Sequence, residues 1–330
     1  MGEKVVVLHS EVKEGATMDE EDVLVQVEAV SEALLDLGYR PVAVPFTLDT
    51  RRVLDTAAGA AFVFNLVETV QGSGRLIHLA PSLLEHAGVP FTGNGSRALF
   101  LTSNKVAAKR CMRWEGLPTP EWFVAADLSP GREWLPRTCI VKSVWEHASI
   151  GLDDASVVRV DSRESLLNQL LEKRARRGGE WFAESYVEGR EFNVSVLESE
   201  SGLHILPPAE IVFSGFPPGR ARILGYRAKW DSRSFEYLHT ERSFKFAGVK
   251  PDFQQELEDL VRRCWDLFGL RGYARVDFRV DDDAGVWILE VNANPCLSPD
   301  AGFAAACDQA GLSYKRLVER IVAGRHCVDS

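Results

Sequence analysis

The sequence lacks the features of a membrane-spanning, secreted or metal-cluster protein. No apolar run approaches the ~18 residues that would span a bilayer, and residues 4–8 form a strand-like apolar segment where a signal peptide would lie. The six cysteines include no Cys-x-x-Cys pair or other metal-binding spacing. We therefore expect a cytoplasmic protein without a membrane partner and with free thiols, among which Cys296 is of most interest.

An excess of positive charge is also absent. The chain has 38 Lys and Arg against 48 Asp and Glu, which gives a net charge of -10. Because a nucleic-acid-binding surface needs clustered basic residues, no nucleic-acid partner is expected. The 45% hydrophobic and 26% charged content is that of an ordinary globular protein. At about 100–200 residues per domain, 330 residues predict two or three domains.

Strand-like and helix-like segments alternate through the first 97 residues. Apolar runs at 5–9, 41–46 and 61–66 predict strands, and helical spacing follows each of the first two. This alternation predicts a parallel sheet covered by helices. We expect an α/β protein with an N-terminal doubly wound domain at 1–97. A central part at 98–180 and a C-terminal part at 181–330, of more α+β character, would follow.

The strongest physical signal is a pair of strand-like segments at 273–280 and 286–292. Side chains of a strand alternate between its two faces. A hairpin with a loop at 282–285 would pair residue 280 with 287, and Asp277 with Glu290. Two carboxylates about 5 Å apart repel each other and destabilise a sheet, and a hard cation removes that cost.

The same register places Asn292 opposite Arg275 and Ile288 on the face of Glu290, with Leu289 on the other face. Two carboxylates and an amide oxygen suit Mg²⁺, which typically takes one or two carboxylates together with substrate phosphates. The alternatives are a solvated outer face or pairing of Asp277 with Arg279.

A lysine lies within the apolar strand expected at 138–144. Lys142 needs an anionic partner or must extend its ammonium group to water, and a nucleotide phosphate would be such a partner. The alternative is that Lys142 protects the edge of a sheet. The long segment 213–246 shows no clear period, which favours a functional lid or disorder.

These segments, in this order and spacing, resemble the ATP-grasp superfamily and, within it, the D-alanine–D-alanine ligase family, over nearly the whole chain. The resemblance is carried by Phe91-Thr92-Gly93, Asn104-Lys105 with Lys109, 116–120, Val141-Lys142, 184–191, Ala228-Lys229, 272–278 and 289–295.

The resemblance implies an ATP-dependent ligase that activates a carboxylic acid as an acyl phosphate, joins it to an amine and releases ADP and phosphate. ATP and two Mg²⁺ ions are the implied cofactors, with Mn²⁺ as an alternative metal. The implied substrates are a small carboxylate and a small amine, of the amino-acid class. A homodimer is also suggested by the family.

The residues that match the family's motifs have implied roles. Lys105 and Lys142 resemble its phosphate-binding lysines, and Lys229 resembles the lid lysine that reaches the γ-phosphate. Glu184 and Glu191 match the contacts to the adenine amino group and the ribose. The matches to the hinge against the adenine are Ser185, Tyr186 and Val187, and the matches to the Mg²⁺ ligands are Asp277, Glu290 and Asn292.

Two further matches concern the reacting carboxylate. Arg275 resembles the arginine that steadies the acyl phosphate and the tetrahedral intermediate. Glu11 corresponds to the glutamate that receives the amino group of the first substrate, and Glu68 is the other candidate for that contact.

The sequence departs from the family pattern at positions expected to contact the amino-acid substrates. Ala148 and Trp230 replace a serine and a tyrosine or histidine. Cys296 replaces the glycine after Pro295, and Ala301 aligns with a substrate-binding serine, with Ser298 nearby. We therefore expect substrates other than two D-alanines. The alternatives are a D-alanine–D-alanine ligase with an altered pocket and a ligase acting on a protein tail.

A third alternative is an ATP-binding regulatory protein without turnover. Such a protein would be expected to lack one or more of the residues implied in catalysis, yet Arg275, Asp277, Glu290 and Asn292 are all present.

Overall fold

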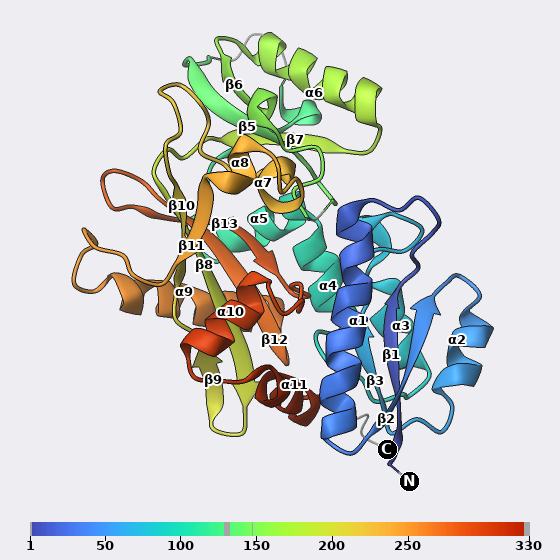
Figure 1. Ribbon diagram of the computed structural model, residues 1–330. Coiled ribbons are helices and arrows are strands. Elements are labelled where there is room, and N and C mark those ends of the chain that lie inside the picture. The colour runs from blue at the N-terminus through green and yellow to red at the C-terminus, as the bar shows by residue number, and fades with distance from the viewer. Residues whose placement is uncertain (1, 129–132, 147, 327–330) are drawn as a thin grey trace.

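Three β-sheets organise the computed structural model, which describes residues 2–128, 133–146 and 148–326 (Figure 1). His147 and Cys327 lie outside these ranges. None of the helices within them is long and apolar enough to cross a membrane. The cysteines of the described ranges are free thiols: Cys111, Cys139, Cys264, Cys296 and Cys307.

The N-terminal sheet confirms the expected parallel α/β arrangement. Its order is β2-β1-β3, and β1 pairs in parallel with both neighbours. Val5 and Val7 of β1 pack toward α1, whereas Val6 and Leu8 pack on the side of α3. A strand buried on both faces explains the uninterrupted apolar run. The elements are β1 Lys4–Ser10, α1 Met18–Asp36, β2 Arg40–Phe46, α2 Thr50–Ala57, β3 Phe62–Leu66 and α3 Leu79–His86.

The second sheet is four-stranded, in the order β4-β7-β5-β6, and α6 covers one of its faces at the top of Figure 1. β6 pairs only residues 137–140 of β5, but the Lys142 side chain is mostly buried and forms an ion pair with Glu184, so the alternative that Lys142 protects a sheet edge is wrong. β7 follows residue 180, so the expected division at that residue runs through this sheet. The elements are β4 Trp122–Val124, β5 Arg137–Ser143, β6 Val157–Val160, α6 Arg163–Arg177 and β7 Trp181–Ser185.

The third sheet runs β11-β10-β8-β12-β13, with β9 pairing β8. Apolar side chains of α4, α5 and α9 pack on one face and form the largest core cluster. On the other side, α10 and α11 join this sheet to α1 and the N-terminal sheet. The strands are β8 Arg190–Ser199, β9 Gly202–Ile205, β10 Ala209–Phe213, β11 Thr240–Ser243, β12 Tyr273–Val280 and β13 Val286–Asn292. The helices are α4 Ser96–Ser103, α5 Lys105–Trp114, α9 Phe253–Phe268, α10 Gly302–Gln309 and α11 Tyr314–Ala323.

The hairpin of β12 and β13 confirms the central pairs of the expected register. Asp277 pairs with Glu290, and Arg275 pairs with Asn292. Toward the loop the register shifts by one residue, so that Val280 pairs with residue 286. The expected pairing of residues 280 and 287 is therefore wrong.

A β-bulge at Leu289 causes this shift. Phe278 pairs with Ile288, which leaves Leu289 as the extra residue between Ile288 and Glu290. An extra residue resets which side chains share a face. Ile288 is fully buried in the core and does not share the face of Glu290, contrary to expectation. Leu289 instead lines a cavity beside Glu290.

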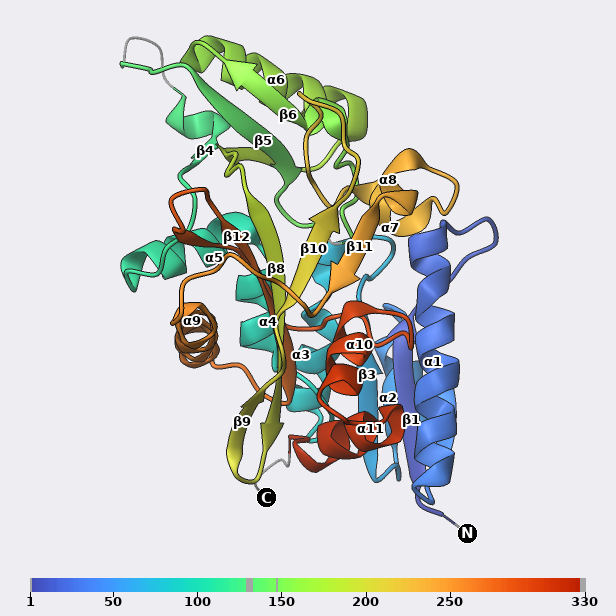
Figure 2. The same ribbon diagram turned by 60° about the vertical axis from the view of Figure 1, so that its left-hand side comes forward.

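Residues 213–246 contain two short helices and a strand, so the alternative that this segment is disordered is wrong. α7 (Tyr226–Trp230) and α8 (Phe235–Leu238) lie between the four-stranded sheet and the N-terminal end of α1 (Figure 2). The Tyr226 hydroxyl donates a hydrogen bond to Asp19 Oδ1 at 2.7 Å. The Trp230 indole donates to the Ala148 carbonyl at 3.2 Å. The segment thus spans two parts of the chain that lie far apart in the sequence.

Candidate active site

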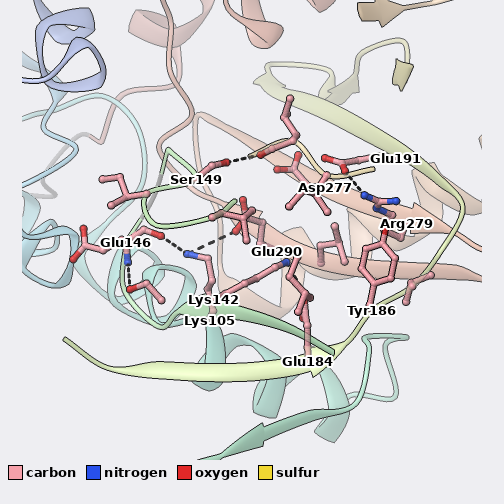
Figure 3. Close-up of a pocket in the computed structure, with 18 of the residues that line it drawn as sticks. Lys105, Lys142, Glu146, Ser149, Glu184, Tyr186, Glu191, Asp277, Arg279 and Glu290 are labelled. Carbon is pink, nitrogen blue, oxygen red and sulfur yellow. Dashed lines mark hydrogen bonds and ion pairs between the residues drawn. The ribbon is translucent and has the colours of Figure 1, made fainter. Parts of the chain in front are cut away.

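A deep cavity lies between the four-stranded sheet and the hairpin of the larger sheet (Figure 3). Strands β5 and β7 supply one wall of the cavity, and β8, β12 and β13 supply the other. Residues 223, 224 and 229, which also line it, belong to the segment 213–246. The expected site residues that line this cavity are Lys105, Lys142, Glu184, Ser185, Tyr186, Val187, Glu191, Lys229, Asp277 and Glu290.

A buried carboxylate between two lysines forms one end of the cavity. Glu184, 1% exposed, lies 2.5 Å from Lys142 Nζ and 2.7 Å from Lys109 Nζ. Burial disfavours the charge on Glu184, but the two ammonium groups outweigh burial and lower the pKa of the carboxyl. Burial also disfavours the charge on Lys142, yet Glu184 raises the pKa of that lysine. Lys142 therefore has the anionic partner that its apolar strand requires.

Lys105 is the first residue of α5, and its side chain points toward the hairpin of β12 and β13. Its Nζ donates to the Glu146 carbonyl at 2.6 Å and lies 3.8 Å from Glu290 Oε2. Burial lowers the pKa of Lys105, against the attraction of Glu290. Lys105 and Lys142 reach the same cavity from α5 and β5, which adjoin each other, so they can hold neighbouring phosphate groups.

Asp277 is held by more groups than the sequence suggested. Arg275 donates two parallel hydrogen bonds to its carboxylate, at 2.7 and 2.8 Å, and the Asn193 amide donates a third at 2.8 Å. Arg279 lies 3.0 Å from Glu191 instead, so the alternative pairing of Asp277 with Arg279 is wrong. Burial raises the pKa of Glu191, against the attraction of Arg279.

The donor set of the hairpin fits a hard cation. Asp277 and Glu290 are register partners, and Asn292 follows Glu290 by two residues on β13. Within the described ranges no group of three or more His, Cys, Asp or Glu side chains could hold a metal alone. A few protein oxygens completed by substrate phosphates is the way in which Mg²⁺ is usually bound.

A second cavity adjoins the first at Lys229 and Glu290, which line both. Its volume is about 390 Å³, within the range of roughly 300–1,000 Å³ typical of small-molecule sites. Arg275 and Asn292 line it, as does Glu68, whereas Glu11 is exposed and lines neither cavity. The positions that depart from the family pattern also line it, namely Ala148, Trp230, Cys296 and Ala301, together with the nearby Ser298.

Asp22 is a residue of this second cavity that sequence reasoning missed. Its carboxylate accepts hydrogen bonds from Ser298 Oγ at 2.8 Å and Cys296 Sγ at 3.0 Å. Gln26, one turn later on α1, donates to Glu68 at 2.8 Å. Asp22 directly follows three acidic residues in the first turn of α1, where negative charge ordinarily suits the helix dipole, so no local signal marked it.

Glu68 titrates close to neutral pH. Burial raises its pKa to about 7, against the hydrogen bond from Gln26, and the nearby Asp22 carboxylate adds to the rise. A carboxyl that binds its proton more tightly when folded lowers the stability of the protein as the pH rises from about 4.5 through 7.

Replacing Glu68 with glutamine removes this loss of stability. Between pH 4.5 and 8, the difference in free energy of unfolding should shift in favour of the variant by up to about 3 kcal/mol. Urea unfolding of both proteins at pH 4.5 and 8 measures the shift. Glu14→Gln, at an exposed position, is the control. A difference that does not change with pH would contradict the assignment.

Comparisons with known proteins agree with this architecture. The family described as D-ala D-ala ligase C-terminus matches residues 113–323. A D-alanine--D-alanine ligase of Synechococcus sp. (strain JA-3-3Ab) is 29% identical over 316 residues, covering 93% of this chain and 90% of the relative. A D-alanine--D-alanine ligase of Haemophilus influenzae (strain PittEE) is 30% identical over 303 residues, covering 89% of this chain and 93% of the relative.

Solved structures share the fold. A D-alanine--D-alanine ligase from Bacillus anthracis, crystallised in complex with ATP, superposes with a TM-score of 0.70 at 18% identity and covers 98% of this chain and 97% of its own. The three sheets thus have the arrangement of the ATP-grasp fold. Because the family match spans well over half of the chain, this protein belongs to the D-ala D-ala ligase C-terminus family.

Proposed function

We propose that this protein is an ATP-dependent carboxylate–amine ligase that acts through an acyl phosphate and releases ADP and phosphate. The observation that carries the proposal is the convergence of Lys105, Lys142, Glu184, Asp277 and Glu290 on one cavity. These residues come from separate elements and suit the phosphates, base and metal of one nucleotide.

The nucleotide end would be held by residues of both sheets. Lys105 and Lys142 would bind phosphates, and the hinge at 185–187 would lie against the adenine. Glu184 would accept from the adenine amino group, and Glu191 would contact the ribose. Each of these side chains lines the cavity.

The metal end would lie at the hairpin. Asp277, Glu290 and Asn292 would hold Mg²⁺, with Mn²⁺ as a substitute. A bound divalent ion supplies positive charge that offsets the repulsion between an attacking carboxylate and the phosphates. In this chain Lys229, whose pKa is lowered by burial and by the neighbouring Arg275, would add its charge at the γ-phosphate.

The second cavity would hold the acid and the amine. Arg275 lines the second cavity and holds Asp277, which lines the first, and it would stabilise the oxyanion that develops when the amine attacks. Because water destroys an acyl phosphate, the segment 213–246 would close the site during turnover. Glu68, rather than Glu11, would receive a substrate amino group, because Glu68 lines this cavity and Glu11 does not.

The substrates are proposed to be amino acids or related acids and amines other than two D-alanines. Asp22 binds the Ser298 hydroxyl and places a negative charge at the loop after β13. A carboxylate of an incoming D-alanine would be repelled there, and Ala301 offers no hydroxyl to bind it. The changes at Ala148, Trp230 and Cys296 alter the same cavity.

D-Alanine alone is therefore expected to support less than about one tenth of the ADP release obtained with the best acid and amine of a panel, since one lost charge contact costs tenfold or more. ADP release with Mg²⁺ and ATP measures both rates. Full turnover with D-alanine alone would show a D-alanine–D-alanine ligase. Magnesium-dependent ATP binding without ADP release from any combination would favour a regulatory protein.

A further inference from the structure

Lys109 has no part in the proposed chemistry, yet it is among the most buried side chains of the protein. It lies on α5 one turn after Lys105 and is 1% exposed. Burial lowers its pKa, against the attraction of Glu184. An ammonium group is rarely buried to this extent unless its partners require it. Lys109 lines neither of the two cavities described above, so it is not placed to contact a nucleotide there.

The partners of Lys109 explain its burial. Its Nζ lies 2.7 Å from Glu184 Oε2, while Lys142 Nζ lies 2.5 Å from the other oxygen of the same carboxylate. Lys142 is 17% exposed and faces the cavity, whereas Glu184 is 1% exposed. One carboxylate thus has a fully buried lysine behind it and a cavity-facing lysine in front of it.

The back of this arrangement is fixed to the hairpin. Lys109 Nζ donates to Thr119 Oγ1 at 2.8 Å, and Thr119 Oγ1 donates to the Ile288 carbonyl at 2.9 Å. The Ile288 amide in turn donates to the Pro118 carbonyl at 2.8 Å. Ile288 lies two residues before Glu290, at the bulge. Lys109 therefore joins the adenine side of the cavity to the metal side.

We propose that Lys109 is a positioning residue for nucleotide binding, because it keeps Glu184 paired when Lys142 turns from that carboxylate to a phosphate. This inference rests on the proposed nucleotide site. A buried carboxylate that loses every cationic partner is strongly destabilised. With Lys109 in place, Lys142 can exchange Glu184 for a phosphate without leaving Glu184 unpaired. Glu184 then stays in the position from which it would accept a hydrogen bond from the adenine amino group.

The Lys109→Met variant tests this exchange through a comparison of ATP with adenosine. Adenosine has no phosphate and does not draw Lys142 away, so its Kd should change by less than about threefold. ATP should bind at least about 30-fold more weakly, because Lys142 must either forgo the phosphate or leave Glu184 unpaired. Isothermal titration with Mg²⁺ measures both constants. Arg110→Met, at the exposed neighbouring position, should change neither.

Further variants separate positioning from packing. Lys109→Arg keeps the charge and should retain at least part of the ATP affinity lost in Lys109→Met. In a Glu184→Gln background, adding Lys109→Met should change the ATP Kd by less than about threefold, since no charged carboxylate then needs a partner. If Lys109→Met does not fold, Lys109→Gln gives the same comparison.

Two results would overturn the proposal. One is an equal loss of ATP and adenosine affinity in Lys109→Met, which would indicate a general packing defect. The other is an undiminished effect of Lys109→Met when Glu184 is already glutamine. A wild-type protein without affinity for ATP would defeat the proposed function as well, whereas either result with normal wild-type binding would defeat only the role of Lys109.

Discussion

Replacing Glu290 with glutamine is expected to reduce magnesium-dependent ADP release by at least about 100-fold, since even outer-shell changes at metal sites cost 10–100-fold. Glu290 is the register partner of Asp277, lies 3.8 Å from Lys105 Nζ and lines both cavities. The glutamine keeps the shape of the side chain but removes the negative charge that would hold Mg²⁺. The charge on Lys105 would also lose its nearest carboxylate.

Asp282→Asn is the matched control for this change, because Asp282 is an exposed acidic residue in the loop of the same hairpin. It should leave turnover within about twofold of wild type, as expected for a surface substitution. Thermal unfolding shows whether Glu290→Gln still folds. Turnover of Glu290→Gln within threefold of wild type, at unchanged magnesium dependence, would mean that the hairpin does not hold the metal.

Replacing Arg275 with methionine should lower kcat by about 100–1,000-fold, the cost of removing one preorganised donor to a developing oxyanion. Arg275 is held rigidly by two hydrogen bonds to Asp277 and lies within the second cavity beside Lys229 and Glu290. Asp277 raises the pKa of Arg275 above its ordinary value although burial acts in the opposite sense, so the guanidinium remains charged. The affinity for ATP should change by only a few-fold, because the nucleotide cavity does not include Arg275.

Rates of ADP release at saturating ATP, with ATP affinity measured separately, distinguish the two effects. Arg275→Lys should give an intermediate rate, because lysine keeps the charge but lacks the planar fork that binds Asp277. Arg271→Met, an exposed change just before β12, is the control. A loss confined to ATP affinity would assign Arg275 to nucleotide binding, and an unchanged rate would remove it from the mechanism.

Local sequence patterns were sufficient to predict the helices and strands on which the site argument depends. The strands at 273–280 and 286–292 have the expected bounds. Their patterns depend on alternation over short stretches, which the chain shows directly. α10, by contrast, was not predicted, because its segment is rich in alanine and has few charged residues, so that its helical period is weak.

The bulge at Leu289 could not be anticipated from alternation. A strand pattern shows which residues alternate, but not where a partner strand inserts an extra residue. The central pairs Asp277–Glu290 and Arg275–Asn292 survived because they lie on the side of the bulge away from the loop. Leu289 is the bulge itself and Ile288 lies on its loop side, so each takes the face opposite to the one expected.

The residues of the second cavity could be predicted only in part from the sequence, for a related reason. Asp22 and Glu68 belong to the N-terminal part of the chain, and Cys296 and Ser298 follow the last strand. Their meeting depends on how α1 packs against the C-terminal segments. No spacing within the sequence connects residues more than 200 positions apart, so Glu11 and Glu68 could be separated only by their places in the fold.

By itself, the sequence predicted the parallel N-terminal sheet and the hairpin with its paired carboxylates, which follow from the periods of strands and helices and from the chemistry of single side chains. The set of lysines proposed to bind a nucleotide came from the resemblance to a known family. Only the tertiary structure decided that Glu184 lies between Lys109 and Lys142, that Arg275 holds Asp277 and that Asp22 borders the second cavity. The physical reason is that ion pairing is a property of distances through space, which the packing of the three sheets sets and the order of residues does not.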